Sequence, residues 1–205
     1  MTVREIDTPR GPARLHITGP RDAAVSVVLG HGAGGGVEAP DLQALATVLP
    51  DQGHRVVLVE QPWRVAGRKV APQPTILDEC WLAALGDLDV AGHLVVGGRS
   101  AGARVACRTA EPLGAAGVLC LAFPLHPPGR PERSRAAELA SATIAPRGAL
   151  VLQGSHDPFG RTGEVQQAVP EARVVEVHGA AHSLPEDLGP AVGEVIAWMS
   201  GIAGE

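Results

Sequence analysis

The sequence predicts an α/β protein, a single domain whose mostly parallel sheet is covered by helices on both faces. Short apolar runs of strand length alternate along the chain with longer segments whose apolar residues recur at helical spacing. Such alternation implies right-handed crossovers between parallel strands, and strands buried on both faces form unbroken apolar runs. A chain of 205 residues is long enough for one core, so we expect one domain over residues 1–205.

The predicted strands begin with an antiparallel hairpin and continue as a parallel series. Alternating residues at Val3–Ile6 and Ala13–Ile17, separated by a Pro- and Gly-containing turn, indicate the hairpin. The later apolar runs are Val25–Leu29, Arg55–Val59, His93–Gly97, Gly117–Ala122, Ala149–Leu152 and Arg173–Val177. Because sites in such sheets lie beyond the carboxyl ends of the strands, the loops that follow these runs are where we expect chemistry.

Apolar stripes and start signals predict the helices. Asp41 is a candidate N-cap, Thr75 and Asp78 have nearly the spacing of a capping box, and Pro190 favours the start of the last helix. The expected helices span about 41–49, 75–88, 101–111, 136–142, 163–168 and 190–199.

Composition and charge argue against several classes of function. Seventeen basic residues against 22 acidic ones give a net charge of −5, which disfavours nonspecific nucleic-acid binding. The N-terminus carries no apolar signal region and no apolar run is long enough to cross a bilayer, so we expect a cytoplasmic protein without a membrane partner. Cys80, Cys107 and Cys120 lie within predicted helices and a strand, and we expect reduced thiols in the core.

The stretch Gly98-Arg99-Ser100-Ala101-Gly102 is a G-x-S-x-G motif. A chain with 26 glycines can contain this pattern by chance, but here a strand precedes it and a helix follows it. A serine at such a sharp strand-to-helix turn takes a strained conformation, usually with positive φ, and strand and helix pass too closely for larger residues at the two glycines. Ser100 is therefore the candidate nucleophile.

A serine nucleophile on this scaffold needs an acid and then a histidine later in the chain. Asp157 follows the strand ending at Leu152 and is the candidate acid, although an aspartate before proline is also common in plain turns. His178 directly continues the last strand, whereas His182 lies in the loop beyond it, which can reach over the serine. We therefore assign the base to His182. Zinc is disfavoured because Gly179 and the strand argue against a helix and no H-E-x-x-H motif is present.

The first glycine-rich loop, Gly30–Gly36, has two interpretations. In one, the N–H groups of Ala33 (or, next best, Gly34) and Ala101 form an oxyanion hole, which needs small residues because the backbone itself approaches the substrate oxygen. In the other, the loop is a G-x-G-x-x-G dinucleotide motif with Glu60 as the ribose-binding acid. The expected helix begins well after the last glycine and Glu60 lies far along the chain, and both features favour the oxyanion hole.

Several basic residues lie in loops expected at the same edge of the sheet. Arg64 and Arg68 are the first candidates to bind a carboxylate or phosphate on the substrate. Arg99, which adjoins the nucleophile, is a further candidate substrate-binding residue, and so is His126, whose Pro-rich loop can line a pocket. The simpler interpretation is that the arginines are solvated or pair with neighbouring carboxylates.

Taken in order, the glycine loop, the serine motif, Gln153–Phe159 and Gly179–Ser183 resemble the α/β-hydrolase fold. Phe123–Gly129 and Glu60–Trp63 are similar to bacterial members of its small, lidless, dienelactone-hydrolase-like branch. The resemblance covers nearly the whole chain. It implies a nucleophile, an acid and a base at the three positions assigned above, with no metal and no organic cofactor. Dienelactone hydrolase itself uses cysteine in place of the serine, so lactone hydrolysis is not implied.

The expected function is that of a serine hydrolase acting on a small-molecule ester or related acyl substrate through an acyl-enzyme. The segment between the strands ending at Ala122 and starting at Ala149 is too short for a large cap, so we expect a shallow, open site. Two alternatives remain. Related proteins include a hydrolase-like subunit of a histone-acetyltransferase complex, which suggests a noncatalytic interaction role. Dinucleotide binding by the glycine loop is the other.

Overall fold

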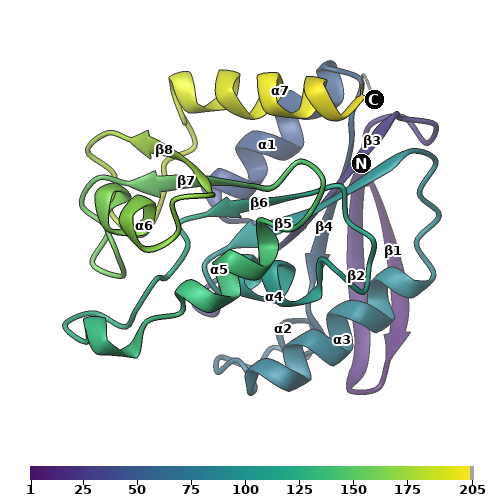
Figure 1. Cartoon of the computed structure of the whole chain (residues 1–205). Coiled ribbons are helices and arrows are strands. Elements are labelled where there is room, and N and C mark those ends of the chain that lie inside the picture. Colours follow the sequence, from purple (N-terminus) through teal and green to yellow (C-terminus); the bar gives the residue numbers. More distant parts are fainter. Residues whose placement is uncertain (204–205) are drawn as a thin grey trace.

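Eight strands form one sheet in the order β1-β2-β4-β3-β5-β6-β7-β8 (Figure 1). The computed structural model describes residues 1–203. The strands are β1 (Thr2–Thr8), β2 (Gly11–Thr18), β3 (Val25–Gly30), β4 (Arg55–Glu60), β5 (His93–Arg99), β6 (Gly117–Leu121), β7 (Ala149–Gly154) and β8 (Arg173–Val177). β2 pairs antiparallel with both β1 and β4, and all pairs from β4 through β3 to β8 are parallel. The predicted fold class is therefore confirmed.

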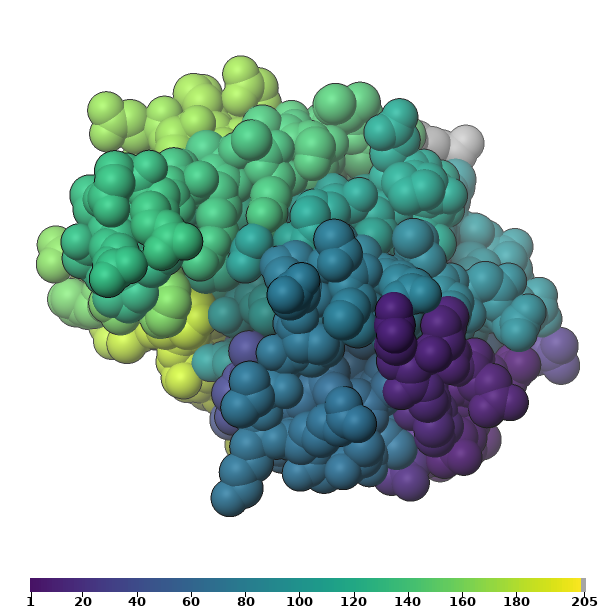
Figure 2. All heavy atoms as spheres, turned by 90° about the horizontal axis from the view of Figure 1, so that it is seen from below, coloured from purple at the N-terminus to yellow at the C-terminus, as the bar shows by residue number. Residues whose placement is uncertain are grey.

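Helices cover both faces of this sheet (Figure 1). One face carries α1 (Pro40–Asp51) and α7 (Pro190–Ala203). The other carries α2 (Pro62–Val65), α3 (Pro74–Gly86), α4 (Ala101–Thr109), α5 (Ala136–Ala142) and α6 (Thr162–Ala168). Figure 2 shows the N-terminal hairpin in purple beside the blue residues of α2 and α3, with which it is in contact. No helix in the described part of the chain is long and apolar enough to span a membrane.

The central strands are buried on both faces, as their mostly apolar sequences predict. In β3, Val27 and Leu29 pack in the layer under α1 and α7, whereas Val28 packs in the layer under α3 and α4. Successive side chains of a strand point to opposite faces, so a strand between two helical layers carries apolar residues toward both of them. This arrangement leaves the strand ends as the places where polar chemistry can reach solvent.

Two helices begin at a proline and not at the cap that the sequence suggested. The N-cap of α1 is Ala39 and that of α3 is Gln73, and neither side chain caps its helix. Proline suits the first helical position because its φ is already helical and its missing N–H would have no partner there. The predictions of Asp41 and Thr75 as caps were wrong. The carboxylate of Asp41 instead lies completely buried.

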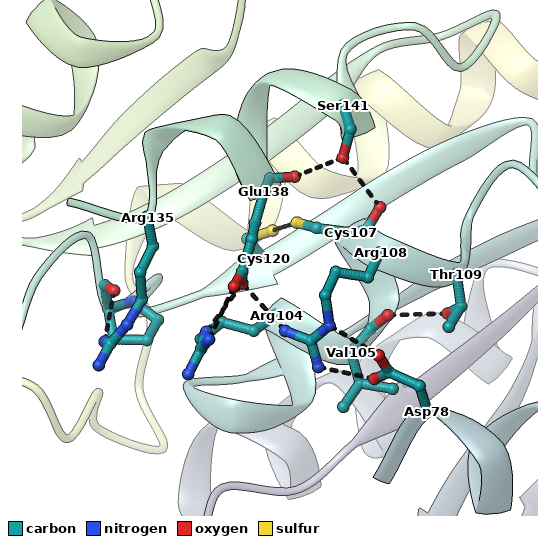
Figure 3. A network of polar contacts seen from close by, with 11 residues as sticks. Asp78, Arg104, Val105, Cys107, Arg108, Thr109, Cys120, Arg135, Glu138 and Ser141 are labelled. Carbon is teal, nitrogen blue, oxygen red and sulfur yellow. Dashed lines mark hydrogen bonds and ion pairs between the residues drawn. The ribbon is translucent and has the colours of Figure 1, made fainter. Parts of the chain in front are cut away.

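A network of ion pairs joins three helices on the α4 side of the sheet (Figure 3). Arg108 of α4 binds Asp78 of α3 through two hydrogen bonds of 2.8 and 2.6 Å. Arg104 binds Glu138 of α5 in the same way, at 2.8 and 2.7 Å. Burial acts to raise the pKa of Glu138, but Arg104 and Arg108 outweigh it and hold that pKa below its usual value. Bidentate pairs of this kind fix α4 against its neighbours.

All three cysteines are buried and free, as expected. Cys107 of α4 and Cys120 of β6 lie with their Sγ atoms 3.6 Å apart, beneath the ion-pair network (Figure 3). Hydrogen bonding between the two thiols and complete burial raise the pKa of Cys107 well above its ordinary value. The thiols therefore behave as apolar packing groups between helix and sheet.

Because α4 contacts β3 so closely, we expect that adding one methyl group at Gly102 destabilises the fold. A Cβ on Gly102 would lie 2.3 Å from the carbonyl oxygen of Gly30, whereas a Cβ on Gly193 in α7 would meet nothing within 4 Å. We expect Gly102→Ala to lower the free energy of unfolding by about 1–3 kcal/mol or more. Gly193→Ala, the matched control, should raise it by up to about 1 kcal/mol because alanine favours helix. Urea unfolding of both variants checks this, and equal effects would contradict it.

Candidate active site

Ser100 lies at the turn between β5 and α4 in a strained backbone conformation. Its φ is 51° and its ψ is −108°. Among the described residues, only Ser100 and Ala122 combine a side chain with positive φ. A Cβ on Gly98 would lie 2.4 Å from the oxygen of Gly30, so the predicted close approach around the serine is present. Strain of this kind persists where the surrounding structure enforces it, and it presents the side chain at the tip of the turn.

The structure brings the three predicted side chains into one continuous contact chain. The Oγ of Ser100 is 2.8 Å from Nε2 of His182, and Nδ1 of His182 is 2.8 Å from Oδ2 of Asp157. The loops after β5, β7 and β8 supply these residues, because parallel strands end at the same edge of the sheet. The competing His178 points away into solvent with a side chain 93% exposed, and its ring is 3.6 Å from Glu176.

The carboxylate of Asp157 is fully buried and its hydrogen-bonding sites are filled. Its Oδ1 accepts the backbone N–H of Phe159 at 2.8 Å, and its Oδ2 accepts the side-chain amide of Gln153 at 3.0 Å besides facing His182. The same amide donates to the carbonyl of Gly160 at 2.7 Å. The ring of Phe159 packs on His182 with centroids 4.1 Å apart. These contacts fix the acid and the imidazole in one orientation.

Gln153 was not singled out from the sequence, although a signal was present. It is the one polar side chain in β7, a strand buried along its whole length. A polar residue inside a fully buried apolar run needs partners, and here those partners include the candidate acid.

His31 holds the glycine loop in place as a neutral imidazole. Its Nδ1 lies 2.9 Å from the carbonyl of Gly32, and its Nε2 accepts the backbone N–H of Gln61 at 3.1 Å. One ring nitrogen thus donates and the other accepts, which is the pattern of the uncharged ring. Burial, the largest influence, lowers the pKa of His31 below 6.5 and favours the same neutral form.

The glycine loop meets the start of α4 at a narrow, mostly apolar cleft with a cavity volume of about 10 Å³. Ala33 and Ala101 both line it, and within residues 1–203 neither backbone N–H has an acceptor. The remaining lining comes from Gly30, His31, Gly32, Gln61, Trp63, Ala71, Leu77, Trp81, Gly102 and Val105. Because α1 begins only at Pro40, the glycine loop does not lead directly into a helix, as the loop of a dinucleotide-binding βαβ unit does.

The other candidate residues are dispersed. Arg64 pairs with Glu38 at 3.1 Å, and Arg68 lies exposed on the loop after α2. His126 is 3.3 Å from Glu164 and lines a separate hollow between its own loop and α6. Arg99 extends beneath the site toward Asp41 and the loop of His182. No cluster of His, Cys, Asp and Glu suited to a metal occurs among residues 1–203.

Comparison with known proteins identifies the family. The sequence-family model of the alpha/beta hydrolase domain matches residues 23–188, so the chain belongs to the α/β-hydrolase family. No curated protein matches the sequence. The lidless serine hydrolase XC6422 from Xanthomonas campestris is 18% identical, with a TM-score of 0.77 over 98% of this chain and 94% of its own.

Two further solved structures are similar over almost their whole length. A serine hydrolase homologue from Coxiella burnetii is 20% identical, with a TM-score of 0.76 and 95% of each chain covered. ATU1826 from Agrobacterium tumefaciens, a putative α/β hydrolase, is 15% identical, with a TM-score of 0.78 over 97% of this chain and 95% of its own. These likenesses show the fold, which confirms the expected small, lidless form of the α/β-hydrolase.

Neutral, buried His31 predicts a particular pH dependence. Because its folded-state pKa lies below 6.5, the unfolded chain binds a proton that the folded chain does not, and stability falls as the pH drops below 6.5. His31→Asn, whose amide can still donate to the Gly32 carbonyl, should lose less unfolding free energy than wild type between pH 7 and pH 5. His93→Asn, at an exposed position, should follow wild type. Urea unfolding at several pH values checks this. Parallel pH profiles for wild type and His31→Asn would contradict it.

Proposed function

We propose that this chain is a serine hydrolase that cleaves a carboxylic ester or related acyl substrate through Ser100, Asp157 and His182. The observation that carries the proposal is the pair of 2.8 Å contacts that join carboxylate, imidazole and hydroxyl in order. Membership of the α/β-hydrolase family and the lidless serine-hydrolase neighbours support it.

In the proposed reaction, the Oγ of Ser100 attacks the substrate carbonyl while Nε2 of His182 takes its proton. Asp157 accepts the Nδ1–H of His182, fixes the tautomer and stabilises the imidazolium. The free N–H groups of Ala33 and Ala101 bind the oxyanion. The histidine then protonates the leaving group, and a water that it activates hydrolyses the acyl-enzyme. These residues provide the whole sequence of steps without a metal or an organic cofactor.

The alternative functions have less support. A noncatalytic interaction protein has no need to hold a serine at positive φ against an aligned histidine, because such strain costs stability. A dinucleotide-binding protein needs a helix that directly continues the glycine loop, whereas α1 begins only at Pro40. We therefore retain the hydrolase as the proposal.

The cleft beside Ala33 and Ala101 supports a short acyl group. Its cavity volume is only about 10 Å³, and Leu77 and Trp81 limit it on the side of α3. Pockets for drug-sized ligands are far larger, about 300 to 1,000 Å³, so this cleft suits only a small acyl group. An anionic group on the substrate stays a weaker proposal, since the charge of Arg64 is already paired and Arg68 alone is left of the two arginines first considered.

Removing the nucleophile or the base should abolish ester hydrolysis. We expect Ser100→Ala and His182→Ala each to lower kcat on p-nitrophenyl acetate by about 10⁴-fold or more, because the three groups act as a unit. His178→Ala is the matched control and should keep nearly full turnover. Labelling with a fluorophosphonate should occur in wild type and fail in Ser100→Ala. A Ser100→Ala protein that keeps a large part of wild-type turnover would exclude this serine as nucleophile.

The short cleft should make the acyl chain length matter. We expect kcat/KM for p-nitrophenyl acetate to exceed that for p-nitrophenyl octanoate by about tenfold or more. An acyl chain that cannot enter the cleft loses transition-state binding. Leu77→Ala should raise the relative rate on the hexanoate by enlarging the cleft. Leu139→Ala, a buried leucine of the same layer that does not line the cleft, is the control. A wild-type preference for the octanoate would rule out this acyl pocket.

A further inference from the structure

Arg99, the residue before Ser100, contacts three separate parts of the site. Its Nη2 donates to the carbonyl oxygen of His182 at 3.1 Å and lies 3.0 Å from the Oγ of Ser183. Its Nη1 lies beside the glycine loop, so close that a Cβ on Gly32 would be only 3.0 Å from this nitrogen. Its Nε is 3.1 Å from Oδ2 of Asp41. The side chain is 13% exposed, so it lies under the site and not at its mouth.

Asp41 anchors this guanidinium from the opposite helical layer. It is the second residue of α1, its side chain is fully buried, and its Oδ1 accepts the N–H of Leu42 at 2.9 Å. Among the described residues, Arg99 is the one ion-pair partner of Asp41. The Oδ2 atom of Asp41 accepts no hydrogen bond of good geometry, so the charge of Arg99 is what compensates it. A buried carboxylate with a single cationic partner is costly to leave alone, which holds Arg99 in place.

The position of Arg99 explains why an arginine suits it. A planar guanidinium presents donors in several fixed directions, so one side chain can face a carboxylate, a backbone carbonyl and a loop at once. A lysine could pair with the carboxylate but could not contact the carbonyl and the loop at the same time. The three contacts lead to the segment that carries the candidate base, the loop that carries the candidate oxyanion donor, and a fixed point in α1. Arg99 itself belongs to the turn that carries the candidate nucleophile.

We infer that Arg99, anchored by Asp41, is a positioning residue that holds the loop of His182 and the glycine loop in register with Ser100. The inference rests on the proposed function for its catalytic consequence, but the positioning of the two loops is a physical claim of its own. Arg99 touches no reacting atom. It acts through the backbone of His182 and through Gly32, and this replaces the earlier expectation that it binds substrate.

The experiment compares Arg99→Met, Arg99→Lys, Asp41→Asn and the double variant Arg99→Met/Asp41→Asn. Arg99→Met should lower kcat on p-nitrophenyl acetate by about 10- to 100-fold, because small misplacements of catalytic groups have effects of this size. KM should change by less than about threefold, since no substrate contact is lost. Arg99→Lys, which keeps the ion pair, should recover part of kcat.

The double variant separates positioning from simple charge compensation. It removes the buried carboxylate that Arg99→Met leaves unpaired, so it should regain stability in urea unfolding without regaining kcat. The matched control is Arg108→Met/Asp78→Asn, which removes a largely buried ion pair between α4 and α3 whose side-chain contacts do not include the His182 loop. It should lower stability and leave kcat within about twofold of wild type. Recovery of kcat together with stability in the Arg99 double variant would overturn the inference.

Hydrogen exchange provides a readout that does not depend on activity. Exchange of the amides in residues 30–36 and 178–185 should become about tenfold faster in Arg99→Met and in its double variant, and stay unchanged in the Arg108 control. Unchanged exchange in Arg99→Met overturns the inference, whatever the activity. If wild type neither hydrolyses esters nor reacts with a fluorophosphonate, the proposed function fails, and the exchange comparison alone decides the role of Arg99.

Discussion

The site depends on one close backbone approach, that of β3 to the turn at Ser100. The carbonyl of Gly30 occupies the space where Cβ atoms of both Gly98 and Gly102 would lie. This contact brings the strand that leads into the glycine loop against the helix that follows the serine. The two free N–H groups, of Ala33 and Ala101, thereby come to line one cleft. Any side chain at either glycine would push these two halves of the site apart.

Rigid elements place the site, and polar contacts beneath it orient its loops. Each of the three candidate residues follows a strand of the parallel sheet, so the sheet brings them to one edge. The final orientation comes from groups that solvent hardly reaches. Gln153 donates a hydrogen bond to Asp157, His31 is hydrogen-bonded to the glycine loop, and Arg99 donates to the carbonyl of His182. A catalytic geometry is maintained by such supporting contacts as much as by the reacting groups themselves.

The ion pairs on the flank of α4 and the ion pair near Ser100 have different structural roles. Arg104, Arg108, Glu138 and Asp78 neutralise one another on the flank of α4, where they fix helices together. Under the serine, the buried pair of Arg99 and Asp41 joins elements that are distant in sequence. The side chains of the first network are 21–22% exposed, so solvent still reaches them in part, whereas Asp41 of the second pair is fully buried and depends on Arg99 for its charge partner.

Local pattern predicted the fold class and the order of the strands and longer helices, although not the short helix α2, and with the chain order of the scaffold it predicted the three residues of the candidate triad. Strand and helix periodicity are properties of neighbouring residues, and the turn at Ser100 requires its glycines within two positions. Only the tertiary structure decided the roles of Asp41, Gln153 and Arg99. The start of α1 at Pro40 freed Asp41 from capping, and the packing of α1 under the sheet brought it to Arg99. Such pairs depend on which elements meet in space, and no short-range sequence signal encodes that meeting.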